Sequence, residues 1–161
     1  MKKLLCLLVC LATLATLCGC NDAHSTFEGF PRPFEASVEG EWNGVTFSAE
    51  VKAGAVNGGE RQITMTFYAP RALEGTTLSR LEDGRFQWSV GDLELPLTAD
   101  LSALFELFPE RAVPTRVSLN EQGLTVVESD TARFLFLPDD TLYRIEAPQG
   151  FLNVTRITYL G

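Results

Sequence analysis

Hydrophobic and polar residues alternate along most of the chain from Phe34 onward. The segments 34–40 (FEASVEG) and 47–54 (FSAEVKAG) both place Phe, Ala and Val at every second position. This period of two predicts half-buried β-strands, because successive side chains of a strand point to opposite faces. Asn43-Gly44, between the two segments, predicts a tight hairpin turn. We therefore expect two neighbouring antiparallel strands at the start of the folded domain.

The same alternation returns after each of a series of turn signals, for example in residues 63–67 (ITMTF) and 86–90 (FQWSV). Turn signals about 8 to 12 residues apart favour an antiparallel sheet over strand–helix–strand units. Near the C-terminus, residues 134–137 (FLFL) are apolar on both faces, and residues 151–161 give no clear register. The turn signals are Asn57-Gly58-Gly59, Asp83-Gly84, Gly91-Asp92, Glu121-Gln122-Gly123 and Asp139-Asp140.

One segment departs from the strand pattern and has apolar residues at helical spacing. They are Leu101, Leu104, Phe105 and Phe108. This spacing lines one face of a helix, for which Asp100 is a suitable N-cap and Pro109 ends the run. So short a helix is unstable alone, so it must pack its apolar stripe on the sheet. Two interpretations stay open: a core helix, or a lid across a concave apolar face.

The N-terminus has the pattern of an export signal. Lys2 and Lys3 are followed by the uncharged run Leu4–Cys18, which matches the positive and apolar regions of a signal peptide. The run is 15 residues long, shorter than the ~20 that a helix needs to cross a bilayer. A cleaved leader is therefore favoured over a transmembrane anchor.

The leader ends in Leu17-Cys18-Gly19-Cys20 and turns polar at once, which resembles the bacterial lipobox. This resemblance implies that the thiolate of Cys20 receives a diacylglyceryl group and that a signal peptidase cleaves between Gly19 and Cys20. Two acyl chains suffice for stable anchoring, at ~0.8 kcal/mol for each buried methylene. The membrane is then a partner through the lipid on Cys20, and the expected location is the extracytoplasmic face of a bacterial cell membrane. The alternative is that Cys20 is simply the fourth cysteine of an apolar leader.

These features divide the chain into three parts. Residues 1–19 are the predicted signal peptide, 20–33 the lipidated N-terminus and tether, and 34–161 a β-rich domain. The tether is polar, with two prolines, although Phe27 and Phe30 offer a way for it to dock on the domain edge. Because only Cys20 remains after cleavage, the domain has no disulfide framework, and its core must supply its stability.

Composition argues against catalysis, metal binding and nucleic-acid binding. The chain has 21 acidic and 13 basic residues, for a net charge of −8, and an acidic surface repels nucleic acid and anionic lipid. His24 is the single histidine and lies in the tether, so neither a histidine-dependent triad nor a His-ligated zinc site is expected. We expect no catalytic residues, no metal and no cofactor. The paired carboxylates lie in or beside predicted turns and are interpreted as solvated: Glu39 with Glu41, Glu82-Asp83 and Asp139-Asp140.

Two patterns carry a family resemblance. The F-x-A-x-V spacing occurs twice, and F-x-x-P-x-x-L-x-G occurs once, at Phe67, Pro70, Leu73 and Gly75. With the lipobox leader, the chain from Phe34 to Leu160 resembles small bacterial lipoproteins of the LolA/LolB-like superfamily. The resemblance implies an open, strongly curved half-barrel with helices on its concave side, and the carriage of acyl chains or lipidated proteins, or envelope monitoring. This sequence departs from the better-known carriers in having one convincing helix, and no family ligand residue is carried over.

The predicted fold class is mainly β (α+β): a single curved antiparallel sheet forming an open half-barrel, with one short helix packed on its concave face. The predicted function is non-catalytic binding of an apolar ligand, a lipid or acyl chain. The alternative is an envelope interaction or structural module with a solid core. Trp42 and Trp88 either pack in the core or line a cavity. The expected apolar ligand face is Leu101, Leu104, Phe105, Phe108 and Trp88.

The lipobox interpretation predicts the outcome of metabolic labelling with a palmitate analogue. The wild-type chain should incorporate the label, and Cys20→Ala should lose it, because the substitution removes the thiol that accepts the diacylglyceryl group. Labelling is read by in-gel detection of the analogue. An unlabelled wild type, or equal labelling of the two proteins, would rule out the anchor.

Overall fold

The computed structural model describes residues 27–55, 60–96 and 102–161. The predicted leader, Gly19, Cys20, His24, Leu101 and the turn at residues 57–59 lie outside this part of the chain. Within it, eleven strands form one sheet in the order β6-β5-β4-β3-β2-β1-β11-β10-β9-β8-β7. The strands are β1 (Phe34–Trp42), β2 (Val45–Ala53), β3 (Ile63–Ala69), β4 (Thr76–Arg80), β5 (Phe86–Val90), β6 (Leu93–Pro96), β7 (Arg116–Leu119), β8 (Thr125–Glu128), β9 (Arg133–Phe136), β10 (Leu142–Ala147) and β11 (Gly150–Tyr159).

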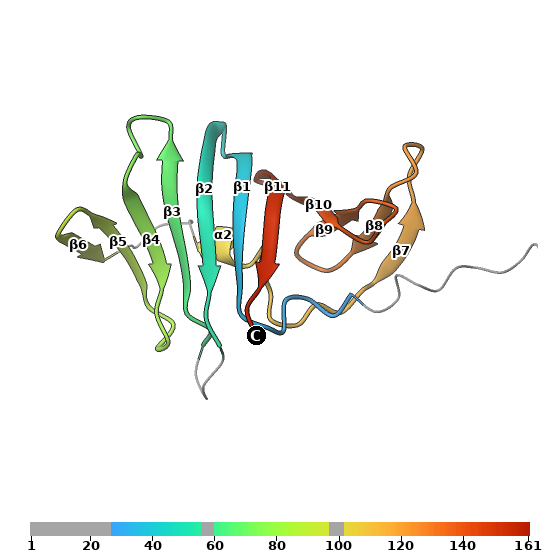
Figure 1. Cartoon of the computed structure of the whole chain (residues 1–161), viewed down its shortest axis with the longest axis horizontal. Helices are drawn as coiled ribbons and strands as arrows, with labels where there is room; N and C mark the ends of the chain where they lie inside the picture. Colours follow the sequence, from blue (N-terminus) through green and yellow to red (C-terminus); the bar gives the residue numbers. More distant parts are fainter. Residues whose placement is uncertain (1–26, 56–59, 97–101) are drawn as a thin grey trace, which may run out of the picture.

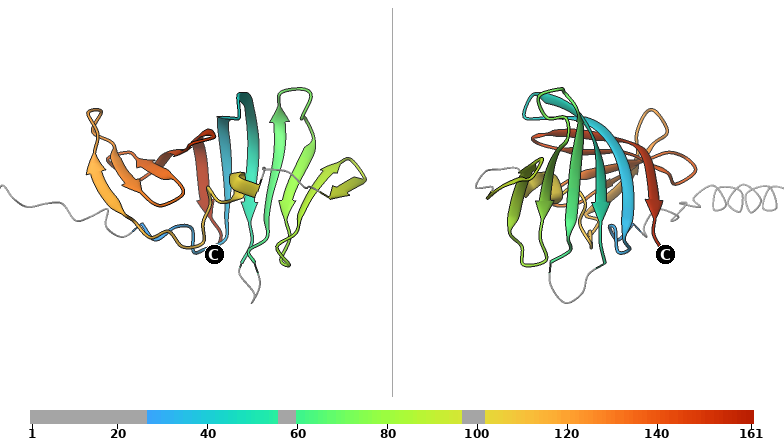
Figure 2. Two further views of the ribbon diagram at one scale, coloured as in Figure 1. Left: turned by 180° about the vertical axis from the view of Figure 1, so that it is seen from behind. Right: turned by 60° about the vertical axis from the view of Figure 1, so that its left-hand side comes forward.

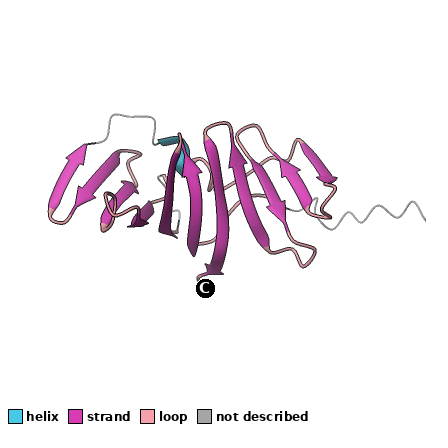
Figure 3. Cartoon of the chain, turned by 90° about the horizontal axis from the view of Figure 1, so that it is seen from above, coloured by secondary structure: helices cyan, strands magenta, loops and turns pink. Residues whose placement is uncertain are grey.

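The sheet consists of two meanders joined at one seam (Figure 1). Strands β1 to β6 pair with their neighbours in sequence, and so do β7 to β11, with every pairing antiparallel. The seam is the pairing of β1 with β11, which runs from Phe34 opposite Tyr159 to Trp42 opposite Gly150. The sheet is curved and does not close, since β6 and β7 end it on either side (Figures 2 and 3). The predicted class, mainly β with one open curved antiparallel sheet, is confirmed.

The core lies along one face of the strands, as the alternation predicts. In β1 the side chains of Phe34, Ala36 and Val38 are buried while those between them are more exposed. The main hydrophobic cluster combines such residues from β1 to β4 with residues of β8 to β11. A second, smaller cluster contains Leu124, Val126 and Leu135. It accounts for the doubly apolar FLFL segment, because Leu135 packs in this cluster while its neighbours Phe134 and Phe136 belong to the main one.

The segment that precedes β1 belongs to the folded body. Phe30 is completely buried, and Phe27 packs against Phe134 with ring centroids 4.7 Å apart. The backbone N–H of Phe30 donates to the Pro109 carbonyl at 2.9 Å, which ties this segment to the chain that follows the helix. Phe27 and Phe30 are therefore docked on the domain, as the sequence allowed. The predicted tether of residues 20–33 is shortened accordingly.

The helix α2 (Ser102–Phe105) is shorter than the stretch of helical spacing in the sequence. The chain turns after Phe105, whose carbonyl accepts a hydrogen bond from the Phe108 N–H at 3.1 Å. This turn buries Leu107, a residue outside the predicted stripe, together with Leu104, Phe105 and Phe108. α2 lies behind the strands in Figure 1 and in front of them in the view from behind (Figure 2). No helix in the described part of the chain combines the length and the apolar character needed to cross a membrane.

The seam places a steric demand on Gly40. A Cβ at this position would collide with the Phe151 carbonyl oxygen of β11 and lie 2.8 Å from Leu152 Cδ2. Gly40→Ala should therefore lower the free energy of unfolding by about 1–3 kcal/mol, the usual cost of overpacking. Urea denaturation measures the change.

Gly54→Ala is the matched control, because a Cβ there would meet its nearest described atom at an ordinary 3.7 Å. If Gly40→Ala and Gly54→Ala changed the unfolding free energy equally, the close approach of β11 to Gly40 would be disproved.

Candidate functional site: an apolar cavity beside the first hairpin

An apolar cavity of about 250 Å³ lies beside the β1–β2 hairpin. The hairpin has a two-residue turn, because Trp42 pairs with Val45 and leaves Asn43 and Gly44 between them. Both turn residues have positive φ, 50° and 80°, as a type I′ turn requires. The predicted turn is confirmed, and it sets Trp42 and Val45 at the cavity wall. We call this space the apolar cavity; its lining is Trp42, Asn43, Val45, Phe47, Phe67, Leu73, Trp88 and Leu104.

A row of aromatic rings forms the floor of the apolar cavity. Phe47 on β2 and Phe67 on β3 meet edge to face with centroids 5.3 Å apart, and Phe67 lies 5.9 Å from Trp88 on β5. Each ring is an inward residue of the period-two pattern on its own strand, so the three rings meet on the same face of the sheet. Aromatic pairs at such distances add about 0.5–1.5 kcal/mol beyond the area that they bury. The row therefore presents a rigid apolar surface.

The F-x-x-P-x-x-L-x-G pattern forms the turn that completes this wall. The Leu73 N–H donates to the Pro70 carbonyl at 2.8 Å, and the Gly75 N–H donates to the Phe67 carbonyl at 2.9 Å. Thr76 Oγ1 donates to the Leu73 carbonyl at 2.6 Å. Gly75 has a φ of 76°, a conformation that glycine adopts without strain. The spacing thus brings Phe67 and Leu73 to the same cavity.

One polar group in this wall has no partner. Trp42 is 4% exposed, and its Nε1 has no hydrogen-bond acceptor among the described residues. An indole N–H is a donor only, and a buried donor without an acceptor costs free energy. The lining of the apolar cavity is almost entirely apolar, so the cavity can hold a hydrocarbon chain.

The residues of the predicted ligand face divide between several places. Leu104 and Trp88 both line the apolar cavity. Phe105 instead stacks on Phe86, with centroids 5.6 Å apart, and Phe108 packs against Phe34 in the core. Lining residues absent from the predicted face are Trp42, Asn43, Val45, Phe47, Phe67 and Leu73. The signals that could have found them are the strand alternation and the Phe–Pro–Leu–Gly spacing.

Asp83 and Asp139, from two of the three carboxylate pairs, stabilise turns, whereas Glu39 and Glu41 lie within β1. Asp83 Oδ1 accepts the Arg85 backbone N–H at 3.1 Å, and this hydrogen bond lowers the pKa of Asp83. In the β9–β10 turn, Asp139 accepts the Thr141 backbone N–H at 3.1 Å, which lowers the pKa of Asp139 in the same way. Among the described residues, no group of three His, Cys, Asp or Glu side chains is placed to hold a metal ion.

Comparison with known proteins finds similarity in structure alone. No protein-family model and no curated protein sequence matches the chain. The solved structure of MucB superimposes with a TM-score of 0.52 and 13% identity, over 84% of this chain and 56% of MucB. A LolA-superfamily protein from Nitrosomonas europaea superimposes with a TM-score of 0.45 and 6% identity, over 85% of this chain and 90% of that one. A domain from Vibrio parahaemolyticus, described as a putative outer membrane lipoprotein-sorting protein, superimposes with a TM-score of 0.44 and 10% identity. The match covers 80% of this chain and 85% of that domain.

Sequence identities this low show similarity of fold alone. The inference that the folds are similar rests on MucB, whose TM-score is above 0.5. This chain spans a little over half of the length of MucB. The open, curved antiparallel sheet that the resemblance to the LolA/LolB-like superfamily implies is confirmed, and the fold is similar to that of MucB.

Proposed function

We propose that the protein is a membrane-anchored extracytoplasmic lipoprotein that binds a lipid or acyl chain in the apolar cavity without catalysing a reaction. The observation that carries this proposal is the cavity wall, in which Trp, Phe, Leu and Val side chains line a space of about 250 Å³. In the proposal, α2 lies on the concave face, and Leu104 covers one side of the ligand. The LolA-like fold agrees with a binding or carrier role.

The volume restricts the ligand. Typical small-molecule pockets enclose about 300–1,000 Å³, so a cavity of about 250 Å³ suits one acyl chain better than a whole diacyl lipid. The competing function is an envelope interaction module with a solid core. The presence of the apolar cavity at this end of the sheet argues against a solid core there.

The two tryptophans supply a direct binding assay. The chain has only Trp42 and Trp88, and both line the apolar cavity. Bromine quenches indole fluorescence on contact, so a brominated fatty acid should quench most of the intrinsic fluorescence of the unlipidated protein from residue 21 onward. The same acid without bromine should bind and cause little quenching. Equal fluorescence with both acids at saturating concentration would contradict the proposal and favour the interaction module.

Substitution at the cavity wall tests where the ligand binds. Val45 and Val90 are both strand valines, 49% and 46% exposed, but only Val45 lines the apolar cavity. Val45→Phe should fill part of the space and weaken binding about tenfold, which corresponds to ~1.4 kcal/mol. Val90→Phe is the matched control and should bind as the wild type does. Equal affinities in the two variants would place the ligand elsewhere.

A further inference from the structure

A second cavity, of about 480 Å³, shares no lining residue with the apolar cavity. Its wall combines the chain before β3, the end of β4, the segment 105–113 and the turn between β8 and β9. It is therefore built from both meanders of the sheet. We call it the Arg61 cavity, after the buried arginine in its wall.

Arg61 is buried without a counter-ion. Its side chain is 2% exposed, and its Nη2 makes a single long contact of 3.5 Å to the Arg32 carbonyl. Nε and Nη1 have no hydrogen-bond acceptor among the described residues, and no described carboxylate forms an ion pair with Arg61. The nearby Glu60 instead lies 3.9 Å from Arg80 Nη1. Burial lowers the pKa of Arg61, and Glu110 opposes that effect only in part.

An unpaired guanidinium in this position is unfavourable, since a buried charge needs a partner of opposite sign. Arginine binds carboxylates particularly well, because its planar donors match the two oxygens of the carboxylate. The Arg61 cavity thus contains a strong anion-binding group that the described chain leaves unsatisfied.

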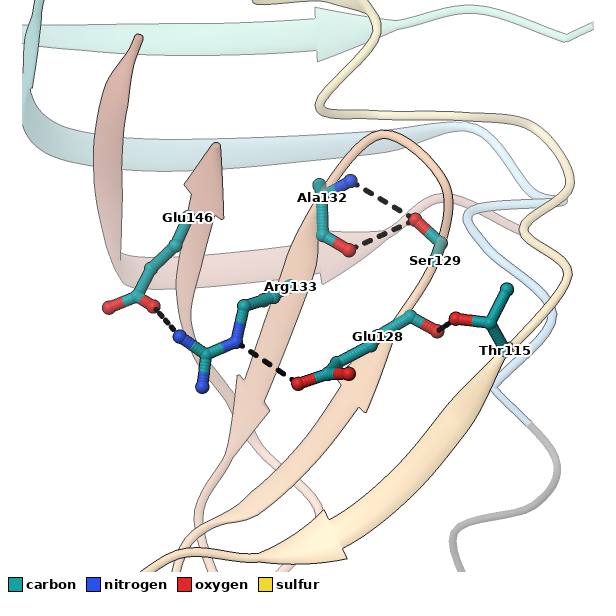
Figure 4. Close-up of polar contacts among 6 residues, drawn as sticks. All are labelled: Thr115, Glu128, Ser129, Ala132, Arg133 and Glu146. Carbon is teal, nitrogen blue, oxygen red and sulfur yellow. Dashed lines mark hydrogen bonds and ion pairs between the residues drawn. The ribbon is translucent and has the colours of Figure 1, made fainter. Parts of the chain in front are cut away.

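The part of the cavity wall that the β8–β9 turn forms is held in place by polar contacts (Figure 4). Ser129 Oγ donates to the Ala132 carbonyl at 3.0 Å and accepts the Ala132 N–H at 3.2 Å, which fixes the β8–β9 turn. Next to it, Arg133 pairs with Glu146 at 3.0 Å and with Glu128 at 3.5 Å. The charge of Arg133 is thus balanced, and the wall that its hairpin forms is preorganised for a ligand.

The remaining lining restricts the chemistry of that ligand. Four acidic side chains and two further arginines share the cavity with Arg61, so a doubly charged anion such as phosphate meets more repulsion than a single carboxylate does. Apolar groups of the segment 105–113 supply a surface for an uncharged body. The acidic residues are Glu60, Glu106, Glu110 and Asp130, the arginines Arg80 and Arg111, and the apolar residues Phe105, Pro109, Ala112 and Val113.

We infer that the Arg61 cavity is a second binding site, which takes a monocarboxylate on an apolar body and pairs its carboxylate with Arg61. The volume of about 480 Å³ lies within the range of small-molecule sites. This inference is independent of the proposed function, because neither cavity uses a residue of the other.

Thermal unfolding of the purified protein, followed by circular dichroism, tests the inference. Hexanoate is the probe, and hexanamide has a similar size and shape without the charge. A ligand that binds only the folded state raises the unfolding temperature, so hexanoate should raise it more than hexanamide, which has no charge to pair with Arg61. Equal shifts with the two compounds, or a larger shift with inorganic phosphate, would overturn the carboxylate assignment.

Arg61→Met identifies the responsible group. This variant should bind hexanoate at least tenfold more weakly in equilibrium dialysis. Without ligand it should unfold no lower than the wild type, because an apolar side chain replaces an unpaired buried charge. Arg71→Met changes an exposed arginine outside the cavity and should behave as the wild type. Unchanged hexanoate affinity in Arg61→Met, or a lower unfolding temperature without ligand, would overturn the inference.

Val45→Phe separates the two sites. It should keep the difference between the hexanoate and hexanamide shifts, because Val45 does not line the Arg61 cavity. A loss of that difference in this variant would place the charge-dependent binding in the apolar cavity and refute the second site. The hexanoate and hexanamide comparison on the wild-type protein stands even if a variant folds poorly.

Discussion

The pairing of β1 with β11 is the interaction on which the rest of the molecule depends. Every other pairing in the sheet joins strands that are neighbours in sequence, so each meander can form locally. Only the seam brings residues 34–42 beside 150–159 and makes one sheet from two halves. The Arg61 cavity draws its walls from both halves and exists only when the seam holds. The close fit at Gly40 shows how little space that pairing leaves.

Aromatic packing supports the seam from the buried face. Phe30 and Phe34 lie 5.1 Å apart between ring centroids, and both contact Phe108. Phe30 also reaches Phe134 on β9, so one cluster links the N-terminal segment, the chain after α2 and the two meanders. Complete burial of a phenylalanine contributes about 1.5–3 kcal/mol. This cluster supplies the stability that a domain without a disulfide framework must draw from its core.

Local patterns predicted most of the sheet, because each depends on neighbours in sequence. The β1–β2 hairpin, β3 and β5 follow from alternation and from turn residues such as Asn43 and Gly44. The register of β11 did not follow, because a bulge opposite Ser37 and Val38 leaves Thr155 as an extra residue and breaks the period. Thr155 Oγ1 donates to the Ser37 carbonyl at 3.0 Å, a contact between distant parts of the chain that no local sequence pattern predicts.

The cavities were harder to predict than the strands. Trp88 and Leu104 belonged to the predicted face, but Phe105 and Phe108 pack elsewhere because the chain turns at the end of α2. The burial of Arg61 had no sequence signal, since an arginine just after a glycine turn normally points to solvent. Its surroundings come from segments up to about seventy residues away in the chain, which meet only in the finished fold.

The docking of Phe27 on the core limits the length of chain between Cys20 and the folded domain. If Cys20 carries its acyl groups, six residues lie between it and Phe27, the first residue that packs on the core. A fully extended chain spans at most ~3.6 Å per residue, so the seven steps from Cys20 to Phe27 reach about 25 Å at most. The folded body would then stay close to the head groups and could not sweep across the periplasm or cell wall. Any molecule that it exchanges with a distant partner must be brought to the membrane surface.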